Sequence, residues 1–409
     1  MIDRGFLSDY FTGVAVKRLS AVEASPKRSN QHEFNGVAKL RSMLGTADQR
    51  AIPARYLWLG DEQQGISSDG IISWYDARRA NESRTEHRLY YQSNEVTSLM
   101  EEGDAMFLAI RRDGSAVVVL TEAGGSMESQ LTWLFGMDAQ PELSFAARNI
   151  EGGKGSELDF AARYLLDELG IEYEESGADR LDELIAPLGK NFPSTREFSA
   201  LARHSLPDID PRVDDPDLVL VSWLDHEEAL FRRLERKIVA DRLASGFSDD
   251  GAPDVDGFLK YSLSVQNRRK SRAGQSLENH LEAIFSARDI RHERGAITEN
   301  GNRPDFLFPS SPEYHNAAFP EARLTMLGAK SSLKDRWRQV LPEARRIREK
   351  QLLTLEPAIS ERQTDQMKAE FLQLVVPAGL HGSFSASQAD WLMNLSEFIN
   401  IVLDRQKAA

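Results

Sequence analysis

Apolar residues follow two different spacings along the chain, and the spacing changes near residue 194. In residues 1–150, short apolar runs rich in β-branched and aromatic side chains are separated by glycine, aspartate, serine and asparagine. This pattern is typical of strands joined by turns. Residues 37–45 and 129–136 are expected to form short helices that end on glycine. Residues 1–150 are therefore predicted to form a β-rich domain, either barrel-like or a sandwich.

From residue 194 onward, helical spacing dominates and then alternates with short apolar runs. Helices are expected over 218–243, 255–265, 274–289, about 334–348 and about 387–404. Buried strands are expected over 306–308 and 324–329, and in the runs LLTLE and LQLVVP. Strands that alternate with helices indicate an α/β domain built around a mixed sheet.

The segment between these two patterns differs from both in charge. Residues 151–190 contain eleven acidic and four basic side chains and begin with a glycine-rich run. We expect this segment to be a connector with one helix. The predicted organisation is residues 1–150 as one domain, 151–192 as an acidic linker and 193–409 as a second domain.

Composition narrows the possible functions. The chain has no cysteine, which excludes disulfides, thiolate zinc sites and cysteine nucleophiles. Its start does not resemble a secretory signal, and no apolar run is long enough for a membrane span, so we expect a soluble cytoplasmic protein without a membrane partner. The net charge is −14, yet residues 330–350 contain eight basic and three acidic side chains. An acidic protein with basic strips suits contacts with nucleic-acid phosphates at chosen places.

Candidate chemistry lies at the ends of two predicted strands. Asp305 precedes the run 306–308, and Lys330 ends the second run. If the strands are neighbours, a carboxylate that can hold a divalent cation lies beside a lysine that can orient water, which suits metal-assisted phosphodiester hydrolysis. By itself this pattern is weak evidence and more often reflects a strand-capping aspartate and a surface lysine. A metal site needs a further carboxylate. The position two before the lysine is Gly328, which has no side chain to bind a metal ion, so this carboxylate must come from elsewhere.

Two nearby segments offer carboxylates. The helix expected at 274–289 has an apolar stripe, which places Glu278 and Glu282 together on one flank. Glu343 follows Lys330 by thirteen residues, on the helix expected to cross the strand ends. Glu282 is interpreted as an ordinary surface acid.

Several long motifs resemble the catalytic domain of the EcoRII restriction endonuclease family. They are Asn267–Phe285, Ala296–Ser310, Lys330–Leu341 and Leu372–His381. The resemblance covers about residue 192 to the end and implies a PD-(D/E)XK restriction-endonuclease-like fold with a mixed sheet flanked by helices. It further implies Asp305 and Glu343 as Mg²⁺ ligands, Glu278 as an assisting catalytic acid and Lys330 as the residue that positions water.

The same resemblance implies DNA contacts. Asp335 and Arg336 match a motif that reads outer C·G pairs, since a carboxylate accepts from cytosine and arginine pairs with guanine; Lys334 and Arg338 are expected to assist. Without the resemblance, these charges would be assigned to a solvated helix start. Expected phosphate contacts, which position DNA without reading sequence, are Arg268, Arg269, Lys270 and Arg272.

The N-terminal domain has a shorter resemblance to the family's effector domain, a B3-like DNA-binding pseudobarrel. The matching residues, expected to bind effector DNA, are Lys17, Arg18, His32, Arg84, Glu86 and Arg88. The loop Pro26–Gln31 departs from the family pattern.

Together these features predict a Type IIE restriction endonuclease. It is expected to be a Mg²⁺-dependent homodimer that cuts double-stranded DNA at a CCWGG-like site, leaves 5′-phosphates and acts beside a cognate cytosine methyltransferase. Its N-terminal domain would bind a second DNA copy as effector or hold the nuclease autoinhibited. The alternatives are a phage-defence nuclease gated by another signal and a DNA-binding protein without catalysis.

Overall fold

The computed structural model describes residues 6–24, 32–60, 65–79, 85–137, 142–151, 158, 160–172, 178–189, 191–249, 252–333 and 336–407. The chain divides into two compact units. The first, the N-terminal unit, comprises Arg4–Glu174 and Ala358–Gln363, and the second, the C-terminal unit, comprises Glu175–Pro357 and Thr364–Ala409. In the part of the chain that the structure describes, no helix is both long and apolar enough to cross a membrane.

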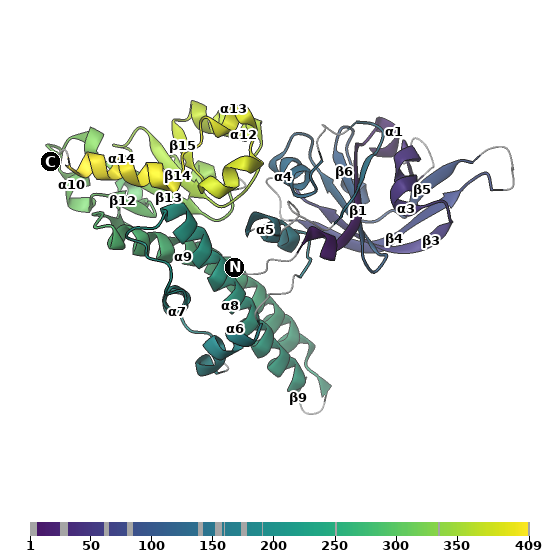
Figure 1. The fold of residues 1–409 in the computed structure, drawn as a ribbon, viewed down its shortest axis with the longest axis horizontal. Coiled ribbons are helices and arrows are strands. Elements are labelled where there is room, and N and C mark those ends of the chain that lie inside the picture. Colours follow the sequence, from purple (N-terminus) through teal and green to yellow (C-terminus); the bar gives the residue numbers. More distant parts are fainter. Residues whose placement is uncertain are drawn as a thin grey trace. The chain divides into compact units, whose positions relative to one another are not determined.

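The described strands of the N-terminal unit form one eight-stranded sheet in the order β2-β5-β4-β3-β7-β6-β1-β8 (Figure 1). They are β1 (Phe11–Arg18), β2 (Glu33–Phe34), β3 (Gln49–Trp58), β4 (Ile66–Asp76), β5 (His87–Tyr91), β6 (Ala105–Arg111), β7 (Ala116–Thr121) and β8 (Ala146–Asn149). The regions next to its two edge strands approach each other, because the N–H of Phe145 donates to the carbonyl oxygen of Gly36 at 3.1 Å. A β-rich N-terminal domain is therefore confirmed, while its assignment to the pseudobarrels stays a prediction.

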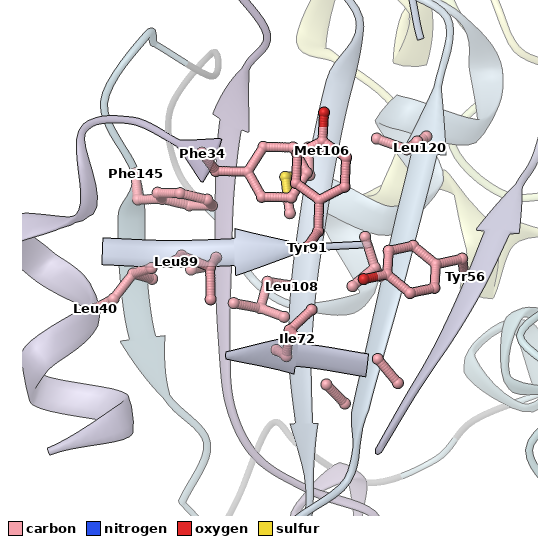
Figure 2. Close-up of a cluster of buried hydrophobic side chains, with 14 of the residues drawn as sticks. Phe34, Leu40, Tyr56, Ile72, Leu89, Tyr91, Met106, Leu108, Leu120 and Phe145 are labelled. Atoms are coloured by element: carbon pink, nitrogen blue, oxygen red, sulfur yellow. The ribbon is translucent and has the colours of Figure 1, made fainter. Parts of the chain in front are cut away.

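Both faces of this sheet are covered by apolar side chains, as the twofold period of a strand allows. Val14 and Val16 of β1 belong to one core and the intervening Ala15 to the other. Figure 2 shows the second core, in which Phe34 stacks on Tyr91 with ring centroids 4.4 Å apart. Short helices cover the faces: α1 (Ala21–Ala24), α3 (Arg41–Leu44), α4 (Ser126–Leu134) and α5 (Phe160–Glu168).

Helix α5 lies in the segment expected to be a linker, yet it contributes Leu165 and Leu166 to the first core. The amphipathic start of that segment is thus part of the N-terminal unit. The two helices expected at 37–45 and 129–136 are confirmed by α3, which follows a 3₁₀ turn, and by α4.

The C-terminal unit begins with helices α6 (Ala178–Ile185), α7 (Thr195–His204), α8 (Pro216–Ala244) and α9 (Val255–Ala287). A short turn with strands β9 (Ser248–Asp249) and β10 (Ala252–Pro253) joins α8 to α9, which form a helical hairpin (Figure 1). The prediction of two helices over 255–265 and 274–289 was wrong, because α9 is continuous. Residues 266–273 contain no proline or glycine that would end it.

The second sheet is mixed, as expected, with the order β11-β12-β13-β14-β15. Its strands are β11 (Glu293–Arg294), β12 (Phe306–Phe308), β13 (Thr325–Lys330), β14 (Lys350–Thr354) and β15 (Leu372–Val375). The remaining helices are α10 (Ser311–His315), α11 (Trp337–Val340), α12 (Glu361–Ala369), α13 (Ala386–Ala389) and α14 (Leu395–Lys407). Strands β11, β12 and β13 pair antiparallel, whereas β13, β14 and β15 pair parallel. An α/β architecture is confirmed for this unit.

Helix α9 packs its C-terminal half on this sheet. Its apolar stripe of Leu277, Leu281, Ile284 and Phe285 is fully buried, as predicted. The Phe285 ring meets Phe306 and Phe308 of β12 edge-on, with centroids 5.3 Å apart in both cases. This packing fixes the flank of α9 that carries Glu278 close to the start of β12.

Candidate active site

The predicted aspartate–lysine pair forms where β12 begins and β13 ends, at one end of the strands of the second sheet. Strands β12 and β13 run antiparallel with Phe306 opposite Leu327, so the residue before β12 lies beside the end of β13. The Lys330 Nζ atom is 2.8 Å from Asp305 Oδ2, which also accepts the N–H of Ala329 at 2.7 Å. Both side chains are about four-fifths buried, with exposed fractions of 16% for Asp305 and 22% for Lys330. The geometry therefore brings the acid and the amine together, as the sequence predicted.

Gly328 cannot carry the missing carboxylate in this fold. It pairs with Leu352 of β14, and a Cβ atom there would lie 3.0 Å from Val340 Cγ2 and 3.2 Å from Leu352 Cδ1. A whole acidic side chain would have to displace both neighbours. The absence of an acid two positions before Lys330 thus has a packing reason.

Glu343 does not lie on a helix, so the prediction of a helix over about 334–348 was wrong. Among the residues of this range that the structure describes, only α11 (Trp337–Val340) is helical, and Pro342, which has no N–H and restricts the preceding residue, does not extend it. The following segment is held to the turn before β12: Asn302 Nδ2 donates to the carbonyl of Pro342 at 3.0 Å, and Arg345 N–H donates to Glu299 Oε2 at 3.1 Å. Tyr314 supports the same turn through its hydroxyl, which donates to Glu299.

The carboxyl of Glu343 is electrostatically coupled to the aspartate–lysine pair. Burial and, to a smaller extent, the charge of Asp305 raise its pKa to about 7, against the opposing charges of Lys330 and Lys350. Its Oε2 atom is buried and has no hydrogen-bond partner among the described residues. A buried acceptor without a donor is costly, and a cation would satisfy it.

The pKa of Glu278 on α9 also depends on the aspartate–lysine pair. Burial raises its pKa, the charge of Asp305 adds to the shift, and Arg294 opposes it. Arg294 Nη2 lies 2.7 Å from Glu278 Oε2. Glu282, expected to be a plain surface acid, is 28% exposed and paired with both Arg294 and Arg196. Sequence reasoning missed Arg294, for which the only signal is an arginine in the short segment before the Pro304-Asp305 strand.

The donor set suits an oxygen-preferring cation such as Mg²⁺. The candidate ligands are the carboxylates of Asp305 and Glu343, and the unpartnered Glu343 oxygen is the observation that favours them. Across the described residues, however, no three Asp, Glu or His side chains are already gathered closely enough to hold a metal ion. The residues fit the cation chemically, although the ligands are not drawn together as a complete shell.

The predicted base-reading residues are only partly described. Lys334 and Asp335 lie outside the described residues. Arg336 is exposed at the start of α11. Arg338 lies over the Trp337 ring at 4.6 Å and donates to Gln366 at 3.2 Å. Trp337 is 2% exposed and belongs to the core.

The predicted phosphate contacts on α9 are largely engaged within the helical hairpin. Arg272 is 7% exposed and pairs with Glu227 and Glu228, so its assignment as a phosphate contact is corrected: α9 turns it toward α8. Arg269 pairs with Glu235 at 2.5 Å, and Arg268 stacks on Phe192 at 4.0 Å. The side chain of Lys270 lies outside the described residues.

Two other arginines are exposed beside the carboxylates. Arg303 lies two residues before Asp305 and Arg345 two residues after Glu343. Their guanidinium groups form no hydrogen bond or ion pair with the residues that the structure describes. The sequence analysis overlooked both, because nothing local distinguishes a free arginine from a paired one.

In the N-terminal unit, Lys17 is fully buried and its predicted contact with DNA is corrected. Its Nζ atom lies 2.5 Å from Glu23 Oε1 and 2.9 Å from the carbonyl of Asn35. Burial lowers the pKa of Lys17, while Glu23 opposes the shift. Lys17 therefore ties α1 to the residue that follows β2 and does not reach the surface.

The other predicted effector residues are nearer the surface but are also paired. Arg18 is bidentate to Glu128 at 2.7 and 2.5 Å. Arg88 pairs with Glu33 and Glu86, each at 3.0 Å, and these acids raise its pKa. His32 lies edge-on to Tyr90 and Tyr91, and its Nδ1 is 3.2 Å from Ser93 Oγ. Arg84 lies outside the described residues.

Comparison with known proteins shows the family to which the chain belongs. Residues 231–399 match the family model for the EcoRII C-terminal domain. The type II restriction enzyme EcoRII of Escherichia coli is 32% identical over 340 residues, which cover 81% of this chain and 78% of that enzyme.

The solved structures similar to this chain include two protein–DNA complexes. Metal-depleted Ecl18kI in complex with uncleaved, modified DNA is 19% identical with a TM-score of 0.46, covering 57% of this chain and 85% of Ecl18kI. A PspGI–substrate DNA complex is 17% identical with a TM-score of 0.44, covering 54% of this chain and 95% of PspGI.

The extent and identity of the curated match define the class: the chain is a type II restriction endonuclease. More narrowly, it belongs to the EcoRII family.

Proposed function

We propose that the protein hydrolyses double-stranded DNA at a CCWGG-like site with Mg²⁺ as cofactor and leaves 5′-phosphates. The observation that carries this proposal is the electrostatic interaction of Asp305, Lys330 and Glu343 near the ends of β12 and β13. Lys330 is paired with Asp305. Glu343 has a buried oxygen without a hydrogen-bond partner among the described residues, and the charges of Asp305 and Lys330 both shift its pKa.

The residues divide the work. Lys330, held 2.8 Å from Asp305, orients the attacking water in line with the scissile P–O bond. The 3′ oxygen leaves, and the phosphate remains on the 5′ side. Mg²⁺ held by Asp305 and Glu343 would supply Lewis-acid stabilisation of the charge that develops on the phosphate. Glu278 assists from α9 as the additional acid.

We assign the contacts with the DNA backbone to arginines near Asp305 and Glu343 in the chain, in preference to those on α9. Arg303 and Arg345, exposed and unpaired among the described residues, flank the two carboxylates. Arg336 and Arg338, together with Lys334 and Asp335, are proposed to read the outer C·G pairs. A pseudopalindromic target favours a homodimer, and a cytosine methyltransferase acting on the same site would protect host DNA.

The N-terminal domain is proposed to bind a second DNA copy as effector or to hold the nuclease autoinhibited. One observation favours a second candidate, a defence nuclease whose N-terminal domain senses another signal. Lys17, Arg18 and Arg88, which were expected to contact effector DNA, are all paired with glutamates. A catalytically inactive DNA-binding protein is less favoured, because the packing around Gly328 explains why that position lacks an acid.

Digestion of defined-sequence plasmids with Mg²⁺ tests the proposal. Discrete fragments from cuts at CCWGG sites, blocked by methylation of the inner cytosine, are the expected result. Poor cutting of one-site DNA, rescued by a short duplex carrying the site, would support the effector role. Cutting that ignores these sites would favour the other signal, and no cutting of any duplex would overturn the nuclease assignment.

A further inference from the structure

Arg294 links the strand beside Asp305 to the helix that carries Glu278. It lies on edge strand β11, opposite Phe306 of β12, and is therefore adjacent in the ladder to the position of Asp305. The next residue, Gly295, donates its N–H to the carbonyl of Asp305 at 3.1 Å. The Arg294 backbone is thus fixed against the strand that carries the aspartate, while its side chain reaches α9.

The Arg294 guanidinium binds three side chains on two neighbouring turns of α9. Its Nη1 atom donates to Asn279 Oδ1 at 2.8 Å and lies 3.0 Å from Glu282 Oε2. Its Nε and Nη2 atoms donate to Glu278 at 2.9 and 2.7 Å. The side chain is 24% exposed, so these charge-assisted bonds are partly shielded from water. Only the planar, five-donor fork of arginine can serve all three partners at once.

Both bonds from Arg294 to Glu278 end on the same oxygen, Oε2. No described residue donates a hydrogen bond to the other oxygen, Oε1. Burial and the Asp305 charge disfavour an ionised Glu278, whereas Arg294 favours it. The arrangement anchors the carboxylate on one side and leaves its second oxygen available beside Asp305.

We propose that Arg294 is a positioning residue that holds Glu278 beside Asp305 with one carboxylate oxygen free for a divalent cation. This inference rests on the proposed function of the site. Arg294 itself touches neither substrate nor cation. It acts through Glu278, in the way that groups behind metal ligands commonly set ligand orientation.

The test compares Arg294→Gln, Arg294→Lys and Arg196→Gln in the full chain. Arg196 of α7 pairs with Glu282 at 2.7 Å and is 72% exposed, so its variant removes an arginine that contacts the same flank of α9 without touching Glu278. The first readout is calorimetric binding of Mn²⁺ without DNA, and the second is the Mg²⁺ concentration that gives half-maximal cleavage. Losing an orienting partner of this kind typically weakens metal binding by roughly 10- to 100-fold.

We expect Arg294→Gln to weaken Mn²⁺ binding by about 10-fold or more, and the half-maximal Mg²⁺ concentration to rise in parallel. Arg294→Lys, which keeps the charge but loses the fork, should fall between this variant and the wild type. Arg196→Gln should bind Mn²⁺ like the wild type. The double variant Glu278→Gln/Arg294→Gln should match Glu278→Gln alone, because Arg294 acts only through Glu278.

Two results would overturn the role of Arg294: unchanged Mn²⁺ binding by Arg294→Gln, or full additivity in the double variant. If Arg294→Gln does not fold, Arg294→Lys and the double variant, which lacks both charges, decide the matter by the same readouts. A wild-type protein that binds no Mn²⁺ and cuts no DNA would instead refute the proposed function, and the positioning role would fall with it.

Discussion

A buried charged group in each of the two units shows a different degree of pairing. In the N-terminal unit, Lys17 is completely buried, but Glu23 and the Asn35 carbonyl satisfy it. In the candidate active site of the C-terminal unit, Glu343 has a buried oxygen with no hydrogen-bond partner among the described residues, and its pKa is raised to about 7. A charge whose partners are complete stabilises a fold, whereas an incompletely paired acid favours a ligand.

The same contrast separates the arginines. Those on α9 that were expected to contact phosphates are held by acids or aromatic rings, and Arg272 has two acidic partners. Arg303 and Arg345, next to the carboxylates, are exposed without an ion pair among the described residues. The number of basic residues in a segment therefore says little about DNA contact until their partners are known.

The largest expected effect comes from breaking the incompletely paired centre. Asp305→Ala or Lys330→Ala should lower the cleavage rate by roughly 10³-fold or more, equivalent to about 4 kcal/mol of transition-state stabilisation. DNA binding measured by gel shift in EDTA should persist, because neither residue is assigned to DNA recognition. The control is Asp404→Ala, an exposed acid on α14, which should cut normally. Normal cutting by Lys330→Ala would remove the site assignment.

The next effect concerns the completely paired region. Lys17→Ala leaves Glu23 buried without its cation, which typically costs about 3–5 kcal/mol of unfolding free energy. Urea denaturation of the full chain, followed through the N-terminal transition, measures this loss. The double variant Lys17→Met/Glu23→Gln removes both charges and should recover much of the stability. If Lys17→Ala instead weakened DNA binding without loss of stability, Lys17 would be a contact after all.

These contrasts also show how far the sequence could lead. The strands flanking the site follow from short apolar runs between turn residues, and the buried stripe of α9 follows from its helical spacing. The adjacency of Asp305 and Lys330 followed from assuming that the two strands are neighbours, which the register bears out. Local patterns were sufficient for the strands and for the stripe, whereas the adjacency of Asp305 and Lys330, 25 residues apart, depended on that assumption.

Features that depend on distant partners were missed. Arg272 is occupied by acids 44 and 45 residues earlier, a pairing that exists only once α8 and α9 lie together. The helix expected over 334–348 has a strong basic and apolar pattern, yet Pro342 and the bonds from Asn302 and Glu299 hold the Glu343 segment in another conformation. Arg294 lies only 12 to 16 residues from its three partners, but no local pattern marks an arginine that bonds to the side chains of a preceding helix.

A smaller effect should appear in the pH dependence of stability. The pKa of Glu343 is raised in the folded protein, so its contribution to stability is full below the unfolded pKa, near 4.5, and is lost as the pH rises through about 7. Glu343→Gln cannot ionise and should therefore gain stability relative to the wild type between pH 4 and pH 8, on the order of 1–2 kcal/mol because the site is partly solvated.

Urea denaturation in EDTA at both pH values measures this gain. Glu349→Gln, at an exposed position six residues along the chain, is the matched control and should show no pH-dependent gain. Equal stability of wild type and Glu343→Gln at both pH values would mean that the Glu343 charge is already compensated in the metal-free protein. The contrast between the two units would then disappear.

The smallest expected effect sharpens the comparison between paired and unpaired arginines. Arg303→Gln and Arg345→Gln should each reduce the slope of log binding constant against log salt by about 0.9, the value for one lost phosphate contact on duplex DNA. Fluorescence titrations in EDTA across a range of salt concentrations measure the slope. Arg212→Gln removes an equally charged side chain that is 71% exposed but bidentate to Asp210, so its slope should equal that of the wild type. If all three variants lowered the slope alike, the effect would reflect net charge, and pairing would no longer distinguish the arginines that meet DNA from those that hold the fold.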